Sequence, residues 1–100
     1  MELTVFDKFS WHFDAGVNEA ILLKYFSKLM NFLKKHQLLS IYGLEIYDLG
    51  VDSSLSITSK MLTEKGIGFL SLWYDKYLKS IDFNRDIDLS FLEGKILNSD

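Results

Sequence analysis

The side chains that could bind a metal ion lie close to the start of the chain. His12, Asp14 and Glu19 fall within a short stretch, and His36 is the only other histidine. Catalytic zinc sites hold the metal through three well-placed protein ligands, and structural sites use four. Two separated histidines with scattered carboxylates do not meet that requirement. We therefore expect no metal ion and no cofactor, and we expect His12 to be a partly exposed strand residue beside Trp11.

Motifs for nucleophilic catalysis and phosphate binding are also missing. The chain has no cysteine, and no serine lies in the Gly-x-Ser-x-Gly turn that exposes a hydrolase nucleophile. Gly66 and Gly68 lack the spacing of nucleotide-binding loops, so we expect them to let the start of a helix approach another backbone. The sequence predicts a protein that is not an enzyme. A small enzyme whose carboxylates converge from distant segments ranks last among the hypotheses.

The composition predicts one folded domain that spans residues 1–100. Hydrophobic residues make up 48% of the chain, well above the range of disordered sequences, and this length is typical of a single core. No apolar stretch approaches the roughly 18 to 20 residues that span a bilayer, and the start lacks the basic region of a signal peptide. We therefore expect a cytoplasmic protein with no membrane contact.

Two long amphipathic helices are the clearest elements. Apolar residues at helical spacing predict a helix over residues 15–37, with Asp14 as its N-cap. A second long helix is predicted to begin after Thr63, whose side chain can cap it, and to run through Asp82. Its wide apolar face predicts a central position in the core. The first helix has a polar stripe on its other side, formed by Lys24, Ser27, Lys28, Asn31, Lys34 and Lys35.

Shorter elements fill the rest of the chain. Alternating aromatic residues predict one bent strand or two short strands over residues 1–13. Residues 38–50 fit a helix or a strand, and Gly50 favours a helix that stops there. Composition and spacing predict a turn at Asp52-Ser53-Ser54, a short strand at Leu55 and Ile57, and a docked strand or short helix within residues 83–100. The predicted fold class is α+β, a mostly helical single domain in which the two long helices pack with a short N-terminal strand or hairpin.

Opposite charges are separated along the chain. No acidic residue lies from Ala20 through Leu44, the segment that holds the four lysines of the first helix, and a solvated helix face is the usual role of such a row. From Asp82 to Asp100, acidic residues outnumber basic ones, and such a surface can steer a basic protein partner. A net charge of −3 and a single arginine disfavour nucleic acid as a partner.

Part of the second long helix resembles a DNA-binding family. Leu62-Thr63-Glu64-Lys65-Gly66, followed by Phe69 and Leu70, looks like the entry to the last helix of many winged-helix transcription regulators. The resemblance implies an alternative function, a DNA-binding or accessory regulator that presents the four lysines to phosphates. The upstream segment 40–50 departs from that family, because it carries two acidic residues and no lysine or arginine for reading DNA.

A larger part of the chain resembles small bacterial immunity proteins, particularly those paired with contact-dependent growth inhibition toxins. The segments that carry this resemblance are Phe9-Ser10-Trp11-His12, Ile41-Tyr42-Gly43-Leu44-Glu45-Ile46-Tyr47 and Ser56-Ile57-Thr58-Ser59-Lys60-Met61-Leu62, together with size and acidity. The resemblance implies a cytoplasmic protein that binds a cognate toxin domain, frequently a nuclease, and neutralises it in a tight complex.

That role leads to a predicted partner-binding surface. Acidic side chains of the 82–93 region would meet a basic toxin surface, and exposed tyrosines would serve as anchors. An apolar surface left over on residues 67–78 would favour a homodimer or a partner groove, and the sequence leaves this open. The predicted partner-binding residues are Asp82, Asp86, Asp88, Glu93, Tyr42 and Tyr47.

Overall fold

The computed structural model describes residues 3–83, 85 and 87–97. These residues form a helical domain with one two-stranded antiparallel sheet, which confirms the predicted α+β class. In chain order, the elements are β1 (Val5–Lys8), α1 (Phe9–Asp14), α2 (Glu19–Lys35), α3 (Ile41–Leu49), β2 (Ser56–Thr58), the 3₁₀ helix η1 (Ser59–Met61), α4 (Glu64–Ser80) and α5 (Ser90–Leu97).

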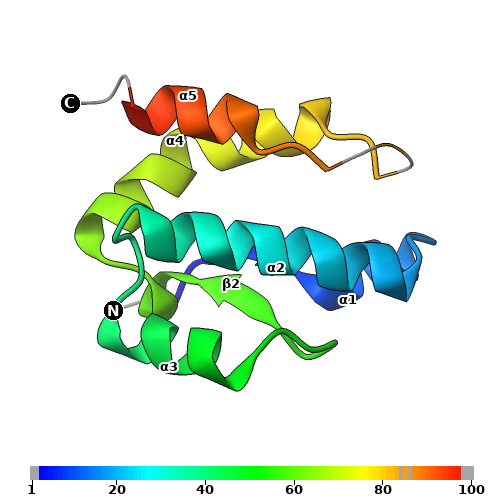
Figure 1. Cartoon of the computed structure of the whole chain (residues 1–100), viewed down its shortest axis with the longest axis horizontal. Helices are drawn as coiled ribbons and strands as arrows, with labels where there is room; N and C mark the ends of the chain where they lie inside the picture. Colours follow the sequence, from blue (N-terminus) through cyan, green and yellow to red (C-terminus); the bar gives the residue numbers. More distant parts are fainter. Residues whose placement is uncertain (1–2, 84, 86, 98–100) are drawn as a thin grey trace.

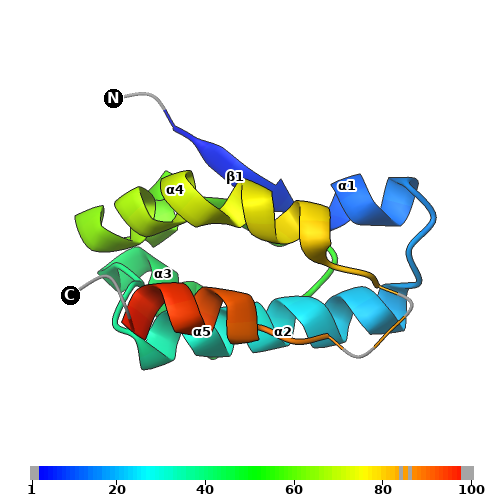
Figure 2. The same cartoon turned by 90° about the horizontal axis from the view of Figure 1, so that it is seen from above.

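The long helix α2 lies in the middle of the molecule. Figure 1 shows α5 on one side of α2 and α3 on the other, with α4 behind. Figure 2 shows that α2 and α5 lie together, while α4, β1 and α1 lie across from them. The hydrophobic core fills the space between these two layers. Its largest fully buried side chains include Tyr25 and Phe26 of α2, Tyr74 and Tyr77 of α4, and Phe9 of α1.

The helix predicted for residues 15–37 is present as α2, but it begins later. Its N-cap is Asn18, whose Oδ1 accepts a hydrogen bond of 2.8 Å from the Ala20 N–H, so the assignment of that role to Asp14 was wrong. The helix ends at Lys35, and Gln37, two residues later, adopts a left-handed φ of 58° and donates its N–H to the Lys34 carbonyl oxygen. This conformation costs a non-glycine residue about 1 kcal/mol, and the hydrogen bonds of the cap offset that cost.

The predicted strand over residues 1–13 is wrong in its second half, because the chain turns into helix α1 after Lys8. Trp11 and Phe13 are 51% and 52% exposed, so the alternation of aromatic residues does not mark the buried face of a sheet. The helix ends at Asp14, and Gly16, just beyond its C-cap Ala15, has a φ of 98° and donates its N–H to the Phe13 carbonyl oxygen. Glycine in this position is the usual end of a helix.

The ambiguous segment 38–50 contains helix α3, as Gly50 indicated. The Oγ of Ser40 caps its start by accepting a hydrogen bond of 3.2 Å from the Gly43 N–H. Gly50, with a φ of 90°, follows its last turn. A glycine at position 43 lets α3 lie directly against η1, because a Cβ there would stand 2.1 Å from the Met61 carbonyl oxygen.

Helix α4 is the second long helix, and Thr63 caps it as predicted. The Thr63 Oγ1 accepts a hydrogen bond of 3.1 Å from the Gly66 N–H, and the helix ends at Ser80, before the predicted Asp82. A Cβ at Gly66 would lie 2.6 Å from the Leu38 carbonyl oxygen, which confirms that this glycine permits a close backbone approach. Gly68 does not share that role, since nothing lies within 4 Å of its Cβ position.

The remaining short elements also agree with the sequence. The Asp52 Oδ1 accepts a hydrogen bond of 2.8 Å from the Ser54 N–H in the predicted turn. Strand β2 follows this turn and pairs with β1. In the C-terminal segment, α5 docks through its buried side chains Leu92 and Ile96. The tail therefore contributes a helix to the core.

We predict that replacing Gly43 with alanine lowers the free energy of unfolding by about 1 to 3 kcal/mol, because the added methyl group overpacks the contact with η1. The matched control is Gly68→Ala, which adds the same group to an exposed position in a helix and should stabilise the chain by about 0.5 to 1 kcal/mol. Urea unfolding followed by circular dichroism measures both effects. Equal effects of the two substitutions would contradict the packing of α3 described here.

Candidate functional site

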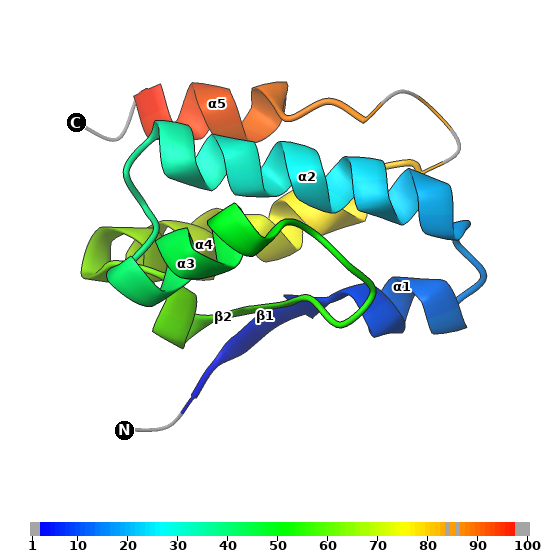
Figure 3. The same cartoon turned by 60° about the horizontal axis from the view of Figure 1, so that its bottom comes forward.

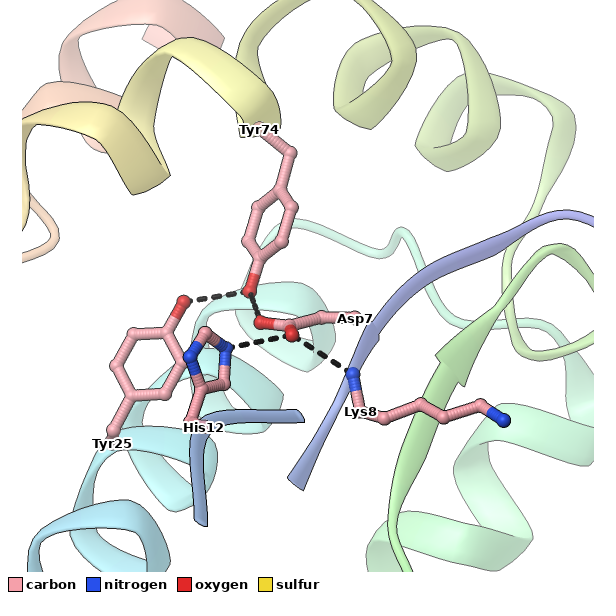
Figure 4. A network of polar contacts seen from close by, with 5 residues as sticks. All are labelled: Asp7, Lys8, His12, Tyr25 and Tyr74. Atoms are coloured by element: carbon pink, nitrogen blue, oxygen red, sulfur yellow. Dashed lines mark hydrogen bonds and ion pairs between the residues drawn. The ribbon is translucent and has the colours of Figure 1, made fainter. Parts of the chain in front are cut away.

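A buried carboxylate, that of Asp7, is the centre of the polar interior (Figure 4). Asp7 is the only charged residue that is buried among the described residues, with 0% of its surface exposed. It lies on β1, where the register with β2 shifts between Val5 and Asp7. A bulge of this kind changes the direction in which a strand's side chains point. The irregular strand thus places a charged group inside the core.

Three groups surround the Asp7 carboxylate. The Tyr74 hydroxyl donates to Oδ2 at 2.5 Å, the Lys8 N–H donates to Oδ1 at 2.8 Å, and the Nε2 atom of His12 lies 2.7 Å from Oδ1. The Tyr25 hydroxyl is 2.6 Å from that of Tyr74 and donates to it, since the Tyr74 proton already points to Asp7. An ionised carboxylate only accepts hydrogen bonds, and every neighbour of Asp7 can donate one.

The tyrosines of this network resist ionisation. Burial raises the pKa of both Tyr25 and Tyr74 well above the ordinary value, and the Asp7 carboxylate acts in the same direction. The pKa of Tyr77 is also raised, by burial and then by the charge of Asp88. A neutral hydroxyl is the form that donates to Asp7. The core therefore keeps Tyr25 and Tyr74 neutral, and the neutral Tyr74 hydroxyl donates a hydrogen bond to the buried Asp7 carboxylate.

The pairing of Asp7 with His12 resembles the orienting half of a catalytic triad, but the Asp7 side chain is fully buried and that of His12 is only 18% exposed. The imidazole of His12 packs against the rings of Tyr25, Phe26 and Phe83, with centroids 5.0 to 6.4 Å away. Neither Asp7 nor His12 lines any of five surface cavities formed by described residues, although Phe83 lines one of them. Nor do three His, Asp or Glu side chains gather as a metal site would require anywhere in the described chain. The network links elements of the fold, and His12 is a helix residue that takes part in it.

The predicted acidic surface does not stand free of the rest of the molecule. Glu93 lies between the His36 Nε2, at 2.8 Å, and the Lys35 Nζ, at 3.5 Å. Asp88 accepts from the N–H of Ser90 at 2.8 Å, at the start of α5. Asp82 is exposed beyond α4, with its Oδ2 3.5 Å from the Nε of Arg85. Asp86 lies outside the described residues.

The two predicted tyrosine anchors lie on the other side of the molecule. Both belong to α3, and α2 separates this helix from α5 (Figure 1). The ring of Tyr42 is 38% exposed and lies under the Lys60 ammonium at 4.4 Å. The Tyr47 hydroxyl donates to Asn31 at 2.7 Å. The five predicted partner-binding residues that the structure describes thus do not form one surface, and contact of the predicted residues with a partner stays a prediction.

Three of the four lysines on the polar stripe of α2 contact other residues of the chain. The Lys28 Nζ donates to the Ile87 carbonyl oxygen at 2.8 Å. Lys34 lies over the ring of Tyr47 at 4.3 Å, and Lys35 pairs with Glu93. These contacts connect α2 with α3 and with the C-terminal segment. They involve three of the four lysines that would contact phosphates in a DNA-binding role, whereas Lys24 is exposed.

Several exposed apolar side chains that the sequence analysis did not single out lie on α3. Ile41 and Leu49 are 81% and 82% exposed, and Leu44 is 39% exposed. Soluble proteins expose single apolar side chains commonly, but three on one helix of nine residues make α3 a candidate interaction element. The available signal was the composition of the segment, since residues 41–49 carry apolar side chains on all sides of the helix and a helix of that kind is normally buried.

Comparison with known proteins finds no matching family model, no similar curated protein and no similar solved structure. None of the described helices combines the length and the apolar character needed to cross a membrane. The surface of α3 is therefore the candidate functional site on its own geometry.

We predict that Tyr74→Phe lowers the free energy of unfolding by about 1.5 to 3 kcal/mol, because the buried carboxylate of Asp7 loses a hydrogen-bond donor. The control is Tyr42→Phe, which removes a hydroxyl from a partly exposed ring and should change stability by less than about 0.5 kcal/mol. Urea unfolding measures both variants. If the two lose the same stability, Tyr74 does not support Asp7 as the geometry indicates.

We also predict that the chain loses stability as the pH rises above about 10, the ordinary tyrosine pKa. Above that value, the unfolded chain releases protons that Tyr25, Tyr74 and Tyr77 retain in the folded state. The folded state then binds more protons, so each of these tyrosines lowers stability by up to about 1.4 kcal/mol per pH unit. Unfolding measured across this range should show a shallower slope for Tyr25→Phe than for the wild type. An unchanged slope would be inconsistent with the raised pKa of Tyr25.

Proposed function

We propose that this chain is a protein-binding inhibitor of the immunity or antitoxin type, which neutralises a cognate toxin domain in the cytoplasm by forming a tight complex. One observation carries the proposal: α3 presents Ile41 and Leu49 to solvent at more than 80% exposure, at 81% and 82%. Exposing such side chains gives up the roughly 1.5 to 3 kcal/mol that burying each would contribute. Binding a partner recovers that contribution.

The surroundings of α3 also support a protein partner. Tyr42 lies next to Ile41, and tyrosine is enriched among the residues that dominate binding energy at interfaces. Apolar residues at the centre with charged residues around them are the usual layout of a protein interface. Glu45 and Asp48 supply exposed charges on the same helix. The resemblance to immunity proteins covers this segment too, and it supplies the class of partner.

A protein partner fits better than DNA. Lys28, Lys34 and Lys35 already have partners within the molecule, and nucleic-acid binding needs several such groups free to contact phosphates. The α3 surface carries acidic side chains and would repel a phosphate backbone. These contacts favour a protein partner over the winged-helix alternative.

The experiment is co-expression of this chain with the toxin domain of the effector encoded next to it. We expect the wild type to protect cells and to purify with the toxin as a stoichiometric complex. Ile41→Glu and Leu49→Glu should each weaken the complex by about tenfold or more, because a charge replaces an apolar contact at the centre of the interface. The affinity is measured by titration calorimetry with the purified toxin domain.

The matched control is Leu72→Glu. Leu72 is 66% exposed on α4, away from α3, so this variant introduces the same charge at a similarly exposed leucine and should protect cells like the wild type. Absence of both protection and complex formation in the wild type would refute the proposal. Equal weakening by Leu72→Glu and Leu49→Glu would move the interface away from α3.

A further inference from the structure

Residues of α3 and β2 line one cavity, and Figure 3 shows α3 lying along β2. Its volume is about 490 Å³, within the usual range of about 300 to 1,000 Å³ for pockets that bind ligands. Tyr42, Ile46 and Leu49 line it from one face of α3, at positions that follow each other by about a turn. Ser56 and Thr58 line it from β2. The cavity is apolar along the helix and polar along the strand.

Strand β2, two residues of which line the cavity, has one open edge. The Phe9 N–H donates to the Leu55 carbonyl oxygen and the Ser59 N–H donates to that of Thr4, so residues 55 and 59 face β1. In an antiparallel ladder the direction of the backbone groups alternates, so those of Ser56 and Thr58 point away from β1. No other strand of the described chain pairs with this edge, since the sheet has two strands. An unpaired edge of this kind is a template for another strand.

The charge around the cavity is acidic at one end. From His36 to Ser59 the chain carries Glu45, Asp48 and Asp52 and no lysine or arginine. All three are exposed, and none forms an ion pair with another described residue. Asp52 lines the cavity beside the end of α3, whose dipole adds negative charge there. Lys60 lies at the opposite end, over the ring of Tyr42.

We propose that this groove receives an extended segment of the partner protein, which adds to the free edge of β2 as a further strand. An apolar side chain of the segment fills the space beside Ile46 and Leu49. A lysine or arginine of the segment lies at the acidic end, beside Asp52 of the cavity lining and within reach of the negative charge that Glu45 adds on α3. This inference rests on the proposed function, because it names the part of a protein partner that α3 recognises.

Each part of the groove favours this occupant over a helix. A strand edge offers main-chain hydrogen bonds, and only an extended backbone can accept and donate them in series. The alternating side chains of a strand would then point toward α3 and away from it. A helix satisfies its own backbone groups and would leave those of Ser56 and Thr58 unused.

The test uses the full chain and a displayed library of random peptides. We expect the selected peptides to share an apolar residue with a lysine or arginine close to it in sequence, and to shift the amide resonances of α3 and β2 when resynthesised and titrated. Glu45→Lys should weaken their binding by about fivefold or more, the effect expected for losing one charge pair and adding repulsion. A peptide with glutamate in place of its basic residue should recover binding to that variant.

Two controls separate the contributions of charge and backbone. Asp75→Lys reverses an exposed charge on α4, away from the groove, and should leave the affinity unchanged. A selected peptide with N-methylated amides keeps its side chains but cannot donate to the strand edge, so its affinity should fall by about fivefold for each hydrogen bond lost. Asp52→Asn removes one charge while keeping the acceptor for Ser54, and should weaken binding in the same direction as Glu45→Lys.

The outcomes are distinct. Selection of no peptide, binding that is insensitive to N-methylation, or equal effects of Glu45→Lys and Asp75→Lys would each overturn the strand-addition proposal. Enrichment of amphipathic helical peptides that bind Ile41 and Leu44 would also overturn it. In all of these cases a toxin complex that forms with the wild type would leave the proposed function standing. If the chain binds the selected peptides at the strand edge but forms no complex with the toxin, the groove binds an extended segment and the proposed function is refuted.

Discussion

The charge of Asp7 is the constraint on which the fold depends. A carboxylate buried without partners costs several kcal/mol, so the chain must bring donors to it. These donors come from distant segments: His12 follows β1 on α1, and Tyr74 lies on α4. Tyr25 of α2 completes the network through Tyr74. Correct assembly of four elements around one carboxylate gives the small domain a specific interior, because an arrangement that left Asp7 unpaired would be strongly disfavoured.

The same network explains why α1 is a helix. A strand through residues 9–13 would carry His12 away from Asp7, whereas a helical turn brings its Nε2 to 2.7 Å from the carboxylate. The turn also buries Phe9, which stacks on Phe26 with ring centroids 5.9 Å apart. Tertiary contacts thus decide between two local structures that the pattern of apolar residues does not separate. Local sequence does mark the end of the helix, through Gly16.

Much of the fold was predictable, since α2 and α4 follow from apolar periodicity and from the cap at Thr63. For residues 38–50, the periodicity of apolar residues did not separate helix from strand, and Gly50 was the signal that favoured helix α3. The buried network was not predictable, because Asp7 and Tyr74 are 67 residues apart in sequence and neither residue type signals burial. The candidate site was predicted only in part. Tyr42 and Tyr47 lie on α3, whereas Glu93 and Asp88 are engaged by contacts that depend on where α5 docks.

The position of α3 connects this architecture to recognition. Gly43 brings the backbone of α3 against η1, and the Tyr47 hydroxyl holds the helix to Asn31 of α2. These contacts fix one face of the helix and leave Ile41 and Leu49 outside the core. An apolar helix held rigidly at the surface needs little ordering when a partner arrives, and preorganisation of this kind lowers the entropic cost of association. The close backbone contact at Gly43 therefore has two consequences, because it packs α3 onto the domain and presents its remaining apolar side chains for binding.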